Sequence, residues 1–341
     1  MADSLNITDT SWSGPALDYM ITRAVVDVDT IVKGCANVVD GIRKQITIPR
    51  VEVSGLIQHY AVTPTSSGNT TVDGRVLDPK KFEMYQEFNP ADFEQHFFAE
   101  QFEQDRLIDR TLPPTAENFI MLQYMKRLNE YFENAFWNSR LNFDPAYASP
   151  VNPTTVGYPL TNTLVANADY MFDGFIYKAL TDPTVQALTP VAYDNTNIRE
   201  NVLTPMRQTI MNNPISKALS YKYGPLGLRY FMSYADQDTY EEALRKDVYK
   251  NIDSTQSGIN RYKGHDIVPL AGLNAGTLFL TVGRPDIQSN FWIGVNSTDD
   301  VQLEMKKTSN PSDLWYVKGI FKVDVNHGWG DQMALFTNLT A

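Results

Sequence analysis

Alternation of apolar and polar residues is clearest near the end of the chain, in the segment "LWYVKGIFKVDVN" at 314–326. Every second residue falls on one side, and that side carries Trp315, Val317, Gly319, Phe321, Val323 and Val325. The other side is mostly polar, with two lysines, an aspartate and an asparagine. Successive side chains of a strand point to opposite faces, so this pattern predicts a long antiparallel strand that is buried on one face.

A second alternating segment lies at 45–58, where Pro49 favours an edge position. The polar, turn-forming segment "TPTSSGNTTVDGR" follows at 63–75, and a strand-like pattern resumes at 76–88. Two extended runs around a polar tip predict a long hairpin, with strands of roughly 10 residues that project about 33 Å. An isolated two-stranded ribbon is only marginally stable in water. The hairpin therefore needs a surface to lie on, provided by its own core or by a neighbouring subunit.

Helical spacing of apolar residues runs through 113–138, where Thr115 follows two prolines and is an acceptable N-cap. One face carries Met121, Met125, Leu128, Phe132 and Ala135. About 24 residues at a rise of roughly 1.5 Å each form a rod of ~36 Å, long enough to brace a whole domain. A stripe of methionine and aromatic residues also suits a cofactor site, but core packing is its commoner use and is the interpretation that we favour.

The remaining segments mix helical and strand patterns, which predicts an α+β fold. The segment 15–44 is rich in β-branched residues and is predicted to be partly helical. Four prolines at 141–160 predict a boundary, and a second α/β lobe is expected at about 145–265. Helical patterns lie at 169–181, 199–220 and 237–250, and strand patterns at 185–191, 226–234, 264–270 and 276–282.

Charge argues against a nucleic-acid-binding function. The 341 residues carry a net charge of −11, which gives no electrostatic attraction for DNA or RNA but does not prevent the protein from enclosing nucleic acid. The densest basic group, Arg43, Lys44 and Arg50, is too small for a nucleic-acid site. The stretch 78–110 holds nine acidic and four basic residues. A solvated face is the simpler interpretation of that stretch, and a strip that meets a basic patch on another subunit is the alternative.

Cysteine content and the N-terminus predict a soluble protein made in a reducing cytosol. Cys35 is the only cysteine, so it forms no internal disulfide, and it is expected to be a small buried residue. The first residues show neither a basic nor an apolar signal region, so no secretory signal is expected. No apolar run approaches the ~18 residues of a membrane span, and no membrane partner is expected.

Catalytic and metal-binding motifs are missing from the sequence. It contains no GxSxG elbow, P-loop, HExxH, GxGxxG or EF-hand pattern. None of the four histidines lies three or four residues from another, so no helical histidine pair can bind a metal. Asp299 and Asp300 could suggest a cation site, but they follow a Ser-Thr turn without further oxygen ligands. We therefore expect no catalytic residue, no cofactor and no metal.

One long segment and the order of the elements resemble a known family. The segment is "YKGHDIVPLAGLNAGTLFLTVGRPDIQSNFWIGVNSTDDVQLEM", at 262–305. It resembles the strands and the "N-x-x-x-G" turn of the major capsid proteins of tailed bacteriophages, which have the Hong Kong 97 fold. A long helix that ends near Trp137 is similar too. The matching positions are Tyr262, Gly264, Ile267, Val268, Asn290, Gly294 and Asp299.

The resemblance implies a Hong Kong 97-type capsid fold with four parts. Residues 1–45 would be an N-terminal arm, and 46–112 an extended β-hairpin loop. A peripheral domain with a long spine helix would comprise 113–140 and 266–341. An axial α/β domain would comprise 141–265. An arm of roughly 45 residues is too short for a cleaved scaffolding region, so no such cleavage is expected.

The resemblance also implies partners. Subunits would form pentamers and hexamers of an icosahedral shell around double-stranded DNA, in a virion that assembles in the host cytoplasm. A scaffolding protein, a portal and decoration proteins would be further partners. Some family members cross-link a loop lysine to an asparagine, although ordinary surface residues are the simpler interpretation here. The candidate contacts between subunits are Ser66, Ser67, Asn69, Lys80, Lys81, Asn290, Trp292, Asn296 and Asp299.

Two alternatives stay open. An encapsulin-type nanocompartment would use the same fold around an enzyme cargo, and sequence alone hardly separates it from a phage capsid. A soluble α/β hydrolytic enzyme that uses an aspartate pair is the other, and the scarcity of histidine and of nucleophile motifs speaks against it. The size of the purified species distinguishes a shell protein from such an enzyme.

Overall fold

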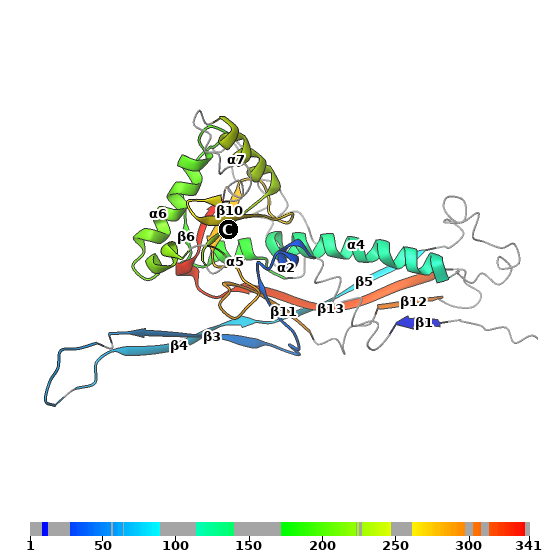
Figure 1. Ribbon diagram of the computed structural model, residues 1–341. Helices are drawn as coiled ribbons and strands as arrows, with labels where there is room; N and C mark the ends of the chain where they lie inside the picture. Colours follow the sequence, from blue (N-terminus) through cyan, green and yellow to red (C-terminus); the bar gives the residue numbers. More distant parts are fainter. Residues whose placement is uncertain are drawn as a thin grey trace, which may run out of the picture.

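The computed structural model describes about two thirds of the chain, and all structural statements below concern these residues. They are 9–12, 28–55, 57–63, 65–88, 114–139, 172–222, 224, 227–246, 261–296, 303–307 and 314–337. The chain is elongated (Figure 1). A lobe of helices and short strands lies at one end, a long helix and long strands run away from it, and a two-stranded ribbon projects beyond the body.

The long helix, α4 (Pro114–Asn138), confirms the helix predicted at 113–138. Its first residue is a proline, which suits the first turn of a helix because its missing N–H would have no partner there. The helix runs along the sheet that contains β13 (Trp315–His327) (Figure 1). Phe132 of the helix meets Phe321 of that strand edge to face, with ring centroids 5.8 Å apart. The part of the predicted stripe from Leu128 to Ala135 therefore packs in the core beneath the helix.

The peripheral sheet is built on β13, whose alternating burial confirms the predicted pattern. Its strand order is β1 (Asp9–Trp12), β12 (Leu303–Lys307), β13, β11 (Phe291–Val295) and β2 (Asn37–Val39). A sixth strand, β5 (Lys80–Phe88), pairs with β13 in antiparallel register. The strand β2 joins parallel to β11, so a segment from the start of the chain completes a sheet built mostly from its end.

The second sheet lies in the lobe and is covered by α6 (Thr204–Asn212) and α7 (Tyr234–Lys246) (Figure 1). The order of its strands is β6 (Gln186–Ala187), β14 (Ala334–Thr337), β10 (Thr277–Thr281), β7 (Arg229–Met232), β9 (His265–Pro269) and β8 (Arg261–Tyr262). The expected domain boundary at residue 265 therefore crosses a hydrogen-bonded sheet, because β7 takes both of its partners, β9 and β10, from later in the chain.

Short helices complete the lobe and the joint. The predicted helical region 199–220 consists of a π-helical turn at Arg199–Leu203, α6, and a 3-10 turn at Lys217–Tyr221. Another 3-10 turn, Gly330–Gln332, precedes β14. The helix α5 (Phe175–Thr181) packs against α4 and is shorter than the predicted 169–181.

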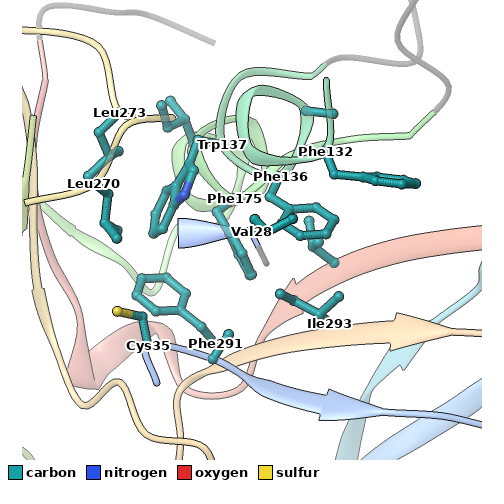
Figure 2. Close-up of a cluster of buried hydrophobic side chains, with 14 of the residues drawn as sticks. Val28, Cys35, Phe132, Phe136, Trp137, Phe175, Leu270, Leu273, Phe291 and Ile293 are labelled. Carbon is teal, nitrogen blue, oxygen red and sulfur yellow. The ribbon is translucent and has the colours of Figure 1, made fainter. Parts of the chain in front are cut away.

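The main core joins α4, α5, the peripheral sheet and the start of the described chain (Figure 2). Trp137 lies at its centre, with its ring centroid 5.1 Å from that of Phe175 and 5.2 Å from that of Phe291. Val28 and Cys35 lie in the same cluster, and Cys35 is buried as expected. Burial of this many large side chains stabilises the arrangement of all four parts.

The segment 28–42, which lies within the arm predicted at 1–45, packs on the body. The backbone N–H and the hydroxyl of Thr30, in α2 (Asp29–Val32), both donate to the carboxylate of Glu133, at 2.9 and 2.8 Å. The Nε1 of Trp137 donates to the Thr30 hydroxyl at 2.8 Å. Only part of the predicted arm can therefore reach a neighbour. Within the segment 15–44 that was predicted to be partly helical, residues 15–27 lie outside the described residues, and in 28–44 only Asp29–Val32 is helical.

Candidate assembly surface

A two-stranded ribbon projects from the described body (Figure 1). It consists of β3 (Ile46–Ser54) and β4 (Asn69–Leu77), which pair in antiparallel register from Ile46 opposite Leu77 to Ser54 opposite Asn69. The loop that joins them begins and ends at two glycines with positive φ, Gly55 at 70° and Gly68 at 93°. Such angles favour glycine, and they let the chain leave one strand and enter the other.

The predicted hairpin exists, but its second strand differs from the expectation. The segment 63–75 was expected to form the polar tip, yet residues 69–75 are strand, because threonine and valine suit a pleated surface even when it is exposed. The expected return strand at 76–88 contributes only its first two residues to the ribbon. Pro79 separates these from β5, which pairs with β13 in the body.

The register divides the ribbon into two unlike faces. Arg50, Asp73 and Arg75 lie on one face, together with Ile48 and Leu77 at the base. Ile48 and Leu77 are buried there with Ile42 and Trp292. The other face carries an outer valine strip, defined as Val51, Val53, Val72 and Val76, with exposed fractions of 56%, 46%, 69% and 43%. This face has no cover from the described body.

The loop extends the apolar surface of the strip. Ile57 is 98% exposed, Tyr60 93% and Val62 89%. Hydrogen bonds within the loop hold its shape, from Gln58 Nε2 to the Thr65 carbonyl at 3.0 Å and from Ser67 Oγ to the Gly55 carbonyl at 3.3 Å. Contiguous exposed apolar residues mark sites of protein interaction. The ribbon and its loop together are therefore the candidate assembly surface.

Five of the predicted contact residues are exposed. Ser66, Ser67 and Asn69 lie in the loop and at the start of β4, next to the apolar surface. Lys80 and Lys81 lie at the start of β5, where Lys80 pairs with Asp78. Contacts between these residues and a neighbour stay a prediction.

Three other predicted residues are buried inside the subunit. Asn290 is 1% exposed, and it donates to Thr281 Oγ1 and to the Trp329 carbonyl, both at 2.8 Å. Trp292 donates to the Ser289 carbonyl at 2.8 Å and packs at the base of the ribbon. Asn296 is 6% exposed. Asp299 lies outside the described residues. The structure thus does not gather the nine residues in one place.

Sequence reasoning missed the polar residues that fasten the ribbon to the body. Arg50 donates to Asp73 Oδ1 and to the Gly328 carbonyl, both at 2.8 Å, and its guanidinium lies 4.9 Å from the Trp329 ring centroid. Arg75 forms an ion pair with Asp182, which follows α5. No spacing pattern could reveal these pairs, because the partners lie up to 278 residues apart.

Asp182 is the centre of this fastening. Its Oδ2 lies 2.8 Å from Nε2 of His327, at the end of β13, and its Oδ1 accepts from the N–H and hydroxyl of Thr184 at 2.9 and 2.7 Å. Burial opposes ionisation of Asp182, but bonds from His327 and Thr184 and the charge of Arg75 outweigh it and lower its pKa. Burial lowers the pKa of His327, and the positive charges of Arg75 and Lys178 lower it further. The hydrogen bond to Asp182 raises the pKa, but by less than these effects lower it. The histidine is therefore neutral and its Nε2–H donates.

Buried carboxylates elsewhere serve structural roles. Asp236, in the first turn of α7, accepts hydrogen bonds from Tyr193, Ser233 and the Gly276 N–H. Burial raises its pKa.

Among the described residues, no group of three or more His, Cys, Asp or Glu side chains could hold a metal ion. In the same part of the chain, no helix has the length and apolar character needed to cross a bilayer.

Comparison with known proteins gives a clear result only at the level of structure. No family model and no curated protein matches the sequence. A chain of the satellite phage P4 procapsid including size determination (Sid) protein is similar, with a TM-score of 0.54 and 10% identity over 95% of this chain and 99% of that one. A chain of the capsid of the empty GTA particle has a TM-score of 0.51 at 10% identity, over 91% of this chain and 90% of that one.

A third similar structure is the capsid of Myoviridae phage XM1, with a TM-score of 0.50 at 10% identity over 91% of this chain and 92% of that one. At this identity the likeness establishes the fold. The chain has the fold of tailed-phage capsid proteins, as the resemblance of its sequence predicted. Its mixture of helices and strands confirms the predicted α+β class.

Proposed function

We propose that this chain is a major capsid subunit, which assembles into pentamers and hexamers of an icosahedral shell that encloses double-stranded phage DNA. The proposal places the protein in the virion and gives it a structural rather than an enzymatic role. The observation that carries it is the ribbon, whose outer valine strip and loop remain exposed in the single chain.

The ribbon favours assembly because its apolar surface is costly in water. Each square ångström of apolar surface that leaves water contributes roughly 25 cal/mol. The described part of the body leaves the strip and the loop exposed, since the ribbon projects away from it (Figure 1). A neighbouring copy that covers the strip would recover this free energy. The strip of one copy then meets a different surface of the next, and such heterologous contacts form rings when their rotation closes.

Charge is compatible with containment of DNA. A net charge of −11 gives the wall no attraction that would immobilise the packaged DNA. A scaffolding protein, a portal and decoration proteins are proposed as further partners. Of the extended loop predicted at 46–112, the ribbon at 46–77 supports the proposal, whereas β5 pairs with β13 in the body.

Substitution on the two faces of β4 tests the proposal. Val72→Glu places a charge in the outer valine strip, whereas Thr71→Glu places the same charge one residue away on the other face. Both positions are exposed, so both subunits are expected to fold. Electron microscopy of the full-length protein should show closed particles for the parent chain and for Thr71→Glu, and none for Val72→Glu.

Two results contradict the proposal: a parent chain that stays a small species at every concentration, or particles of Val72→Glu that match the parent. The contents of purified particles separate the proposal from its nearest alternative. Nucleic acid inside particles made during infection supports the capsid, whereas a protein cargo without nucleic acid supports a compartment shell.

A further inference from the structure

The base of the ribbon contains a polar junction between three elements that are distant in sequence. We call it the basal clasp, and it consists of Arg75, Asp182, Thr184 and His327. Arg75 comes from β4, Asp182 and Thr184 from the turn after α5, and His327 from the end of β13. The carboxylate of Asp182 accepts hydrogen bonds from all three partners. It is the one group that touches every element of the junction.

The clasp lies where it can control the direction of the ribbon. Within the described chain, the hydrogen bonds of residues 51–72 all run inside the ribbon and its loop. Among the described residues, the hydrogen bonds and ion pairs between ribbon and body lie at the base. They involve Arg50, Arg75, the Val76 carbonyl, which accepts from Asn326 Nδ2, and the Asp78 N–H, which donates to Asp324. The direction in which the outer ribbon projects is therefore set by these contacts at its base.

Polar and apolar contacts at the base have different effects on the position of the ribbon. The apolar contact of Ile48 and Leu77 with Trp292 holds the base against the body. Hydrophobic contact is non-directional, so it permits a range of tilts. The clasp is directional, because a guanidinium and an imidazole must both reach one buried oxygen of Asp182, whose side chain is 4% exposed. Gly330 packs so closely that a Cβ there would lie 2.1 Å from Thr184 Oγ1.

We propose that Asp182 is a positioning residue for assembly, which fixes the angle at which the ribbon leaves the subunit by binding Arg75 and His327 at the same time. This inference rests on the proposed function, since the angle decides where on a neighbouring copy the outer valine strip lands. A ribbon that swings freely would reach several places, and contacts whose rotation does not close give open or irregular assemblies.

The chain contains a matched control for Asp182. Asp194 also accepts from the N–H and the hydroxyl of a threonine two residues later, Thr196. It lies in the lobe, away from the ribbon, and binds neither an arginine nor a histidine among the described contacts. Asp182→Asn and Asp194→Asn each keep Oδ1 for the threonine. Only Asp182→Asn replaces the oxygen that Arg75 and His327 share.

A distance measurement on unassembled full-length subunits tests the inference directly. Spin labels on Ser67→Cys in the loop and Lys217→Cys in the lobe report the angle of the ribbon, and the native Cys35 is buried and does not react. The parent and Asp194→Asn should give one narrow distance distribution. Asp182→Asn and Arg75→Gln should each lose that narrow peak, and the double variant should be no broader than either single variant.

Unchanged narrow peaks in Asp182→Asn and Arg75→Gln would overturn the inference, and so would an equal broadening in Asp194→Asn. If circular dichroism shows that Asp182→Asn fails to fold, Arg75→Gln decides alone, since that side chain is 27% exposed. The distance measurement needs no particles. A parent chain that forms no shell would therefore refute the proposed function, while the narrow or broad distribution would still decide the role of Asp182.

Discussion

The strands β10 and β4 show how differently two strands of one molecule are supported by their surroundings. All five residues of β10, Thr277–Thr281, are buried between β14 and β7. In β4 the first five of nine residues are exposed, and burial is complete only at Leu77. Both strands are rich in residues that suit a sheet. The difference is the number of partners, because β10 has strands on both sides and β4 has one. Stability therefore decreases from the core toward the tip of the ribbon, and the tip depends on what lies outside the subunit.

The largest effect on the stability of the subunit is expected from a substitution in the buried core. Trp137→Ala removes the ring that packs on Phe175 and Phe291, and should lower the free energy of unfolding by about 3–5 kcal/mol. Tyr60→Ala is the control in the loop, where the ring is 93% exposed, and it should leave unfolding of the subunit unchanged. Urea unfolding of unassembled subunits measures both. Equal losses would mean that the tip is supported within the subunit.

A smaller effect is expected at the junction between the two regions. Gly330→Ala brings a Cβ to within 2.1 Å of Thr184 Oγ1 and 3.0 Å of Asp182, so the clasp must shift at a cost of about 1–3 kcal/mol. Gly328→Ala is the matched control, because the Cβ added there would have Asn290 Oδ1 as its nearest neighbour, at 3.2 Å. Hydrogen exchange at β3 and β4 should accelerate more in Gly330→Ala. Equal exchange in the two variants would show that the base of the ribbon does not depend on the clasp.

The pH dependence of the clasp gives a third test. The pKa of His327 is lower in the folded chain, because burial and the charges of Arg75 and Lys178 outweigh Asp182. The unfolded chain therefore takes up the proton first, and stability is lost as pH falls below about 6.5, with a slope of at most about 1.4 kcal/mol per pH unit. Protonation would also place a proton on Nδ1, which is buried without a partner.

Urea unfolding at pH 7.5 and 5.5 measures this loss. His327→Gln keeps a donor for Asp182 but does not titrate, so it should reduce the pH dependence. His265, whose pKa burial also lowers, and buried carboxylates such as Asp324, whose pKa burial raises, remain in both proteins and contribute to the residual slope. An unchanged pH dependence in His327→Gln would show that the histidine does not respond to pH in the folded chain.

The smallest effect on the subunit is expected on the outer valine strip. Val72→Thr keeps the shape and the strand propensity of an exposed residue, so the free energy of unfolding should change by less than about 0.5 kcal/mol. Particles should nevertheless dissociate at a lower denaturant concentration than those of the parent, because the strip loses apolar area in the interface. Light scattering during a urea titration follows dissociation. Equal midpoints would remove the strip from the interface.

Local pattern was enough to predict elements with strong periodicity. The face of β13 and the extent of α4 follow from residue spacing, since one face of each is buried in the same subunit. The sequence predicted a hairpin here, but it did not predict which residues pair in its second strand. The polar sequence 69–75 looks like a turn, and it forms a strand because β3 pairs with it along its whole length. Exposed strands lack the apolar alternation from which a strand can be recognised.

Contacts between distant segments were beyond sequence reasoning. The burial of Val28 depends on α4 and β11, which lie far along the chain. Asn290 was predicted to contact a neighbour, yet it bonds to Thr281 and Trp329 within the subunit. An asparagine in a turn has the same local pattern whether it is buried or exposed. The clasp combines residues 75, 182 and 327, and only the folded chain brings them together.

The central claim is that a second copy of this chain covers the outer valine strip and the loop. Electron microscopy of particles formed by the full-length chain, at a resolution that traces β3 and β4, tests this most directly. The account predicts that the ribbon lies across an adjacent subunit, with Val51, Val72 and Tyr60 buried in the contact. A ribbon that folds back on its own body, or that stays exposed in closed particles, would contradict it.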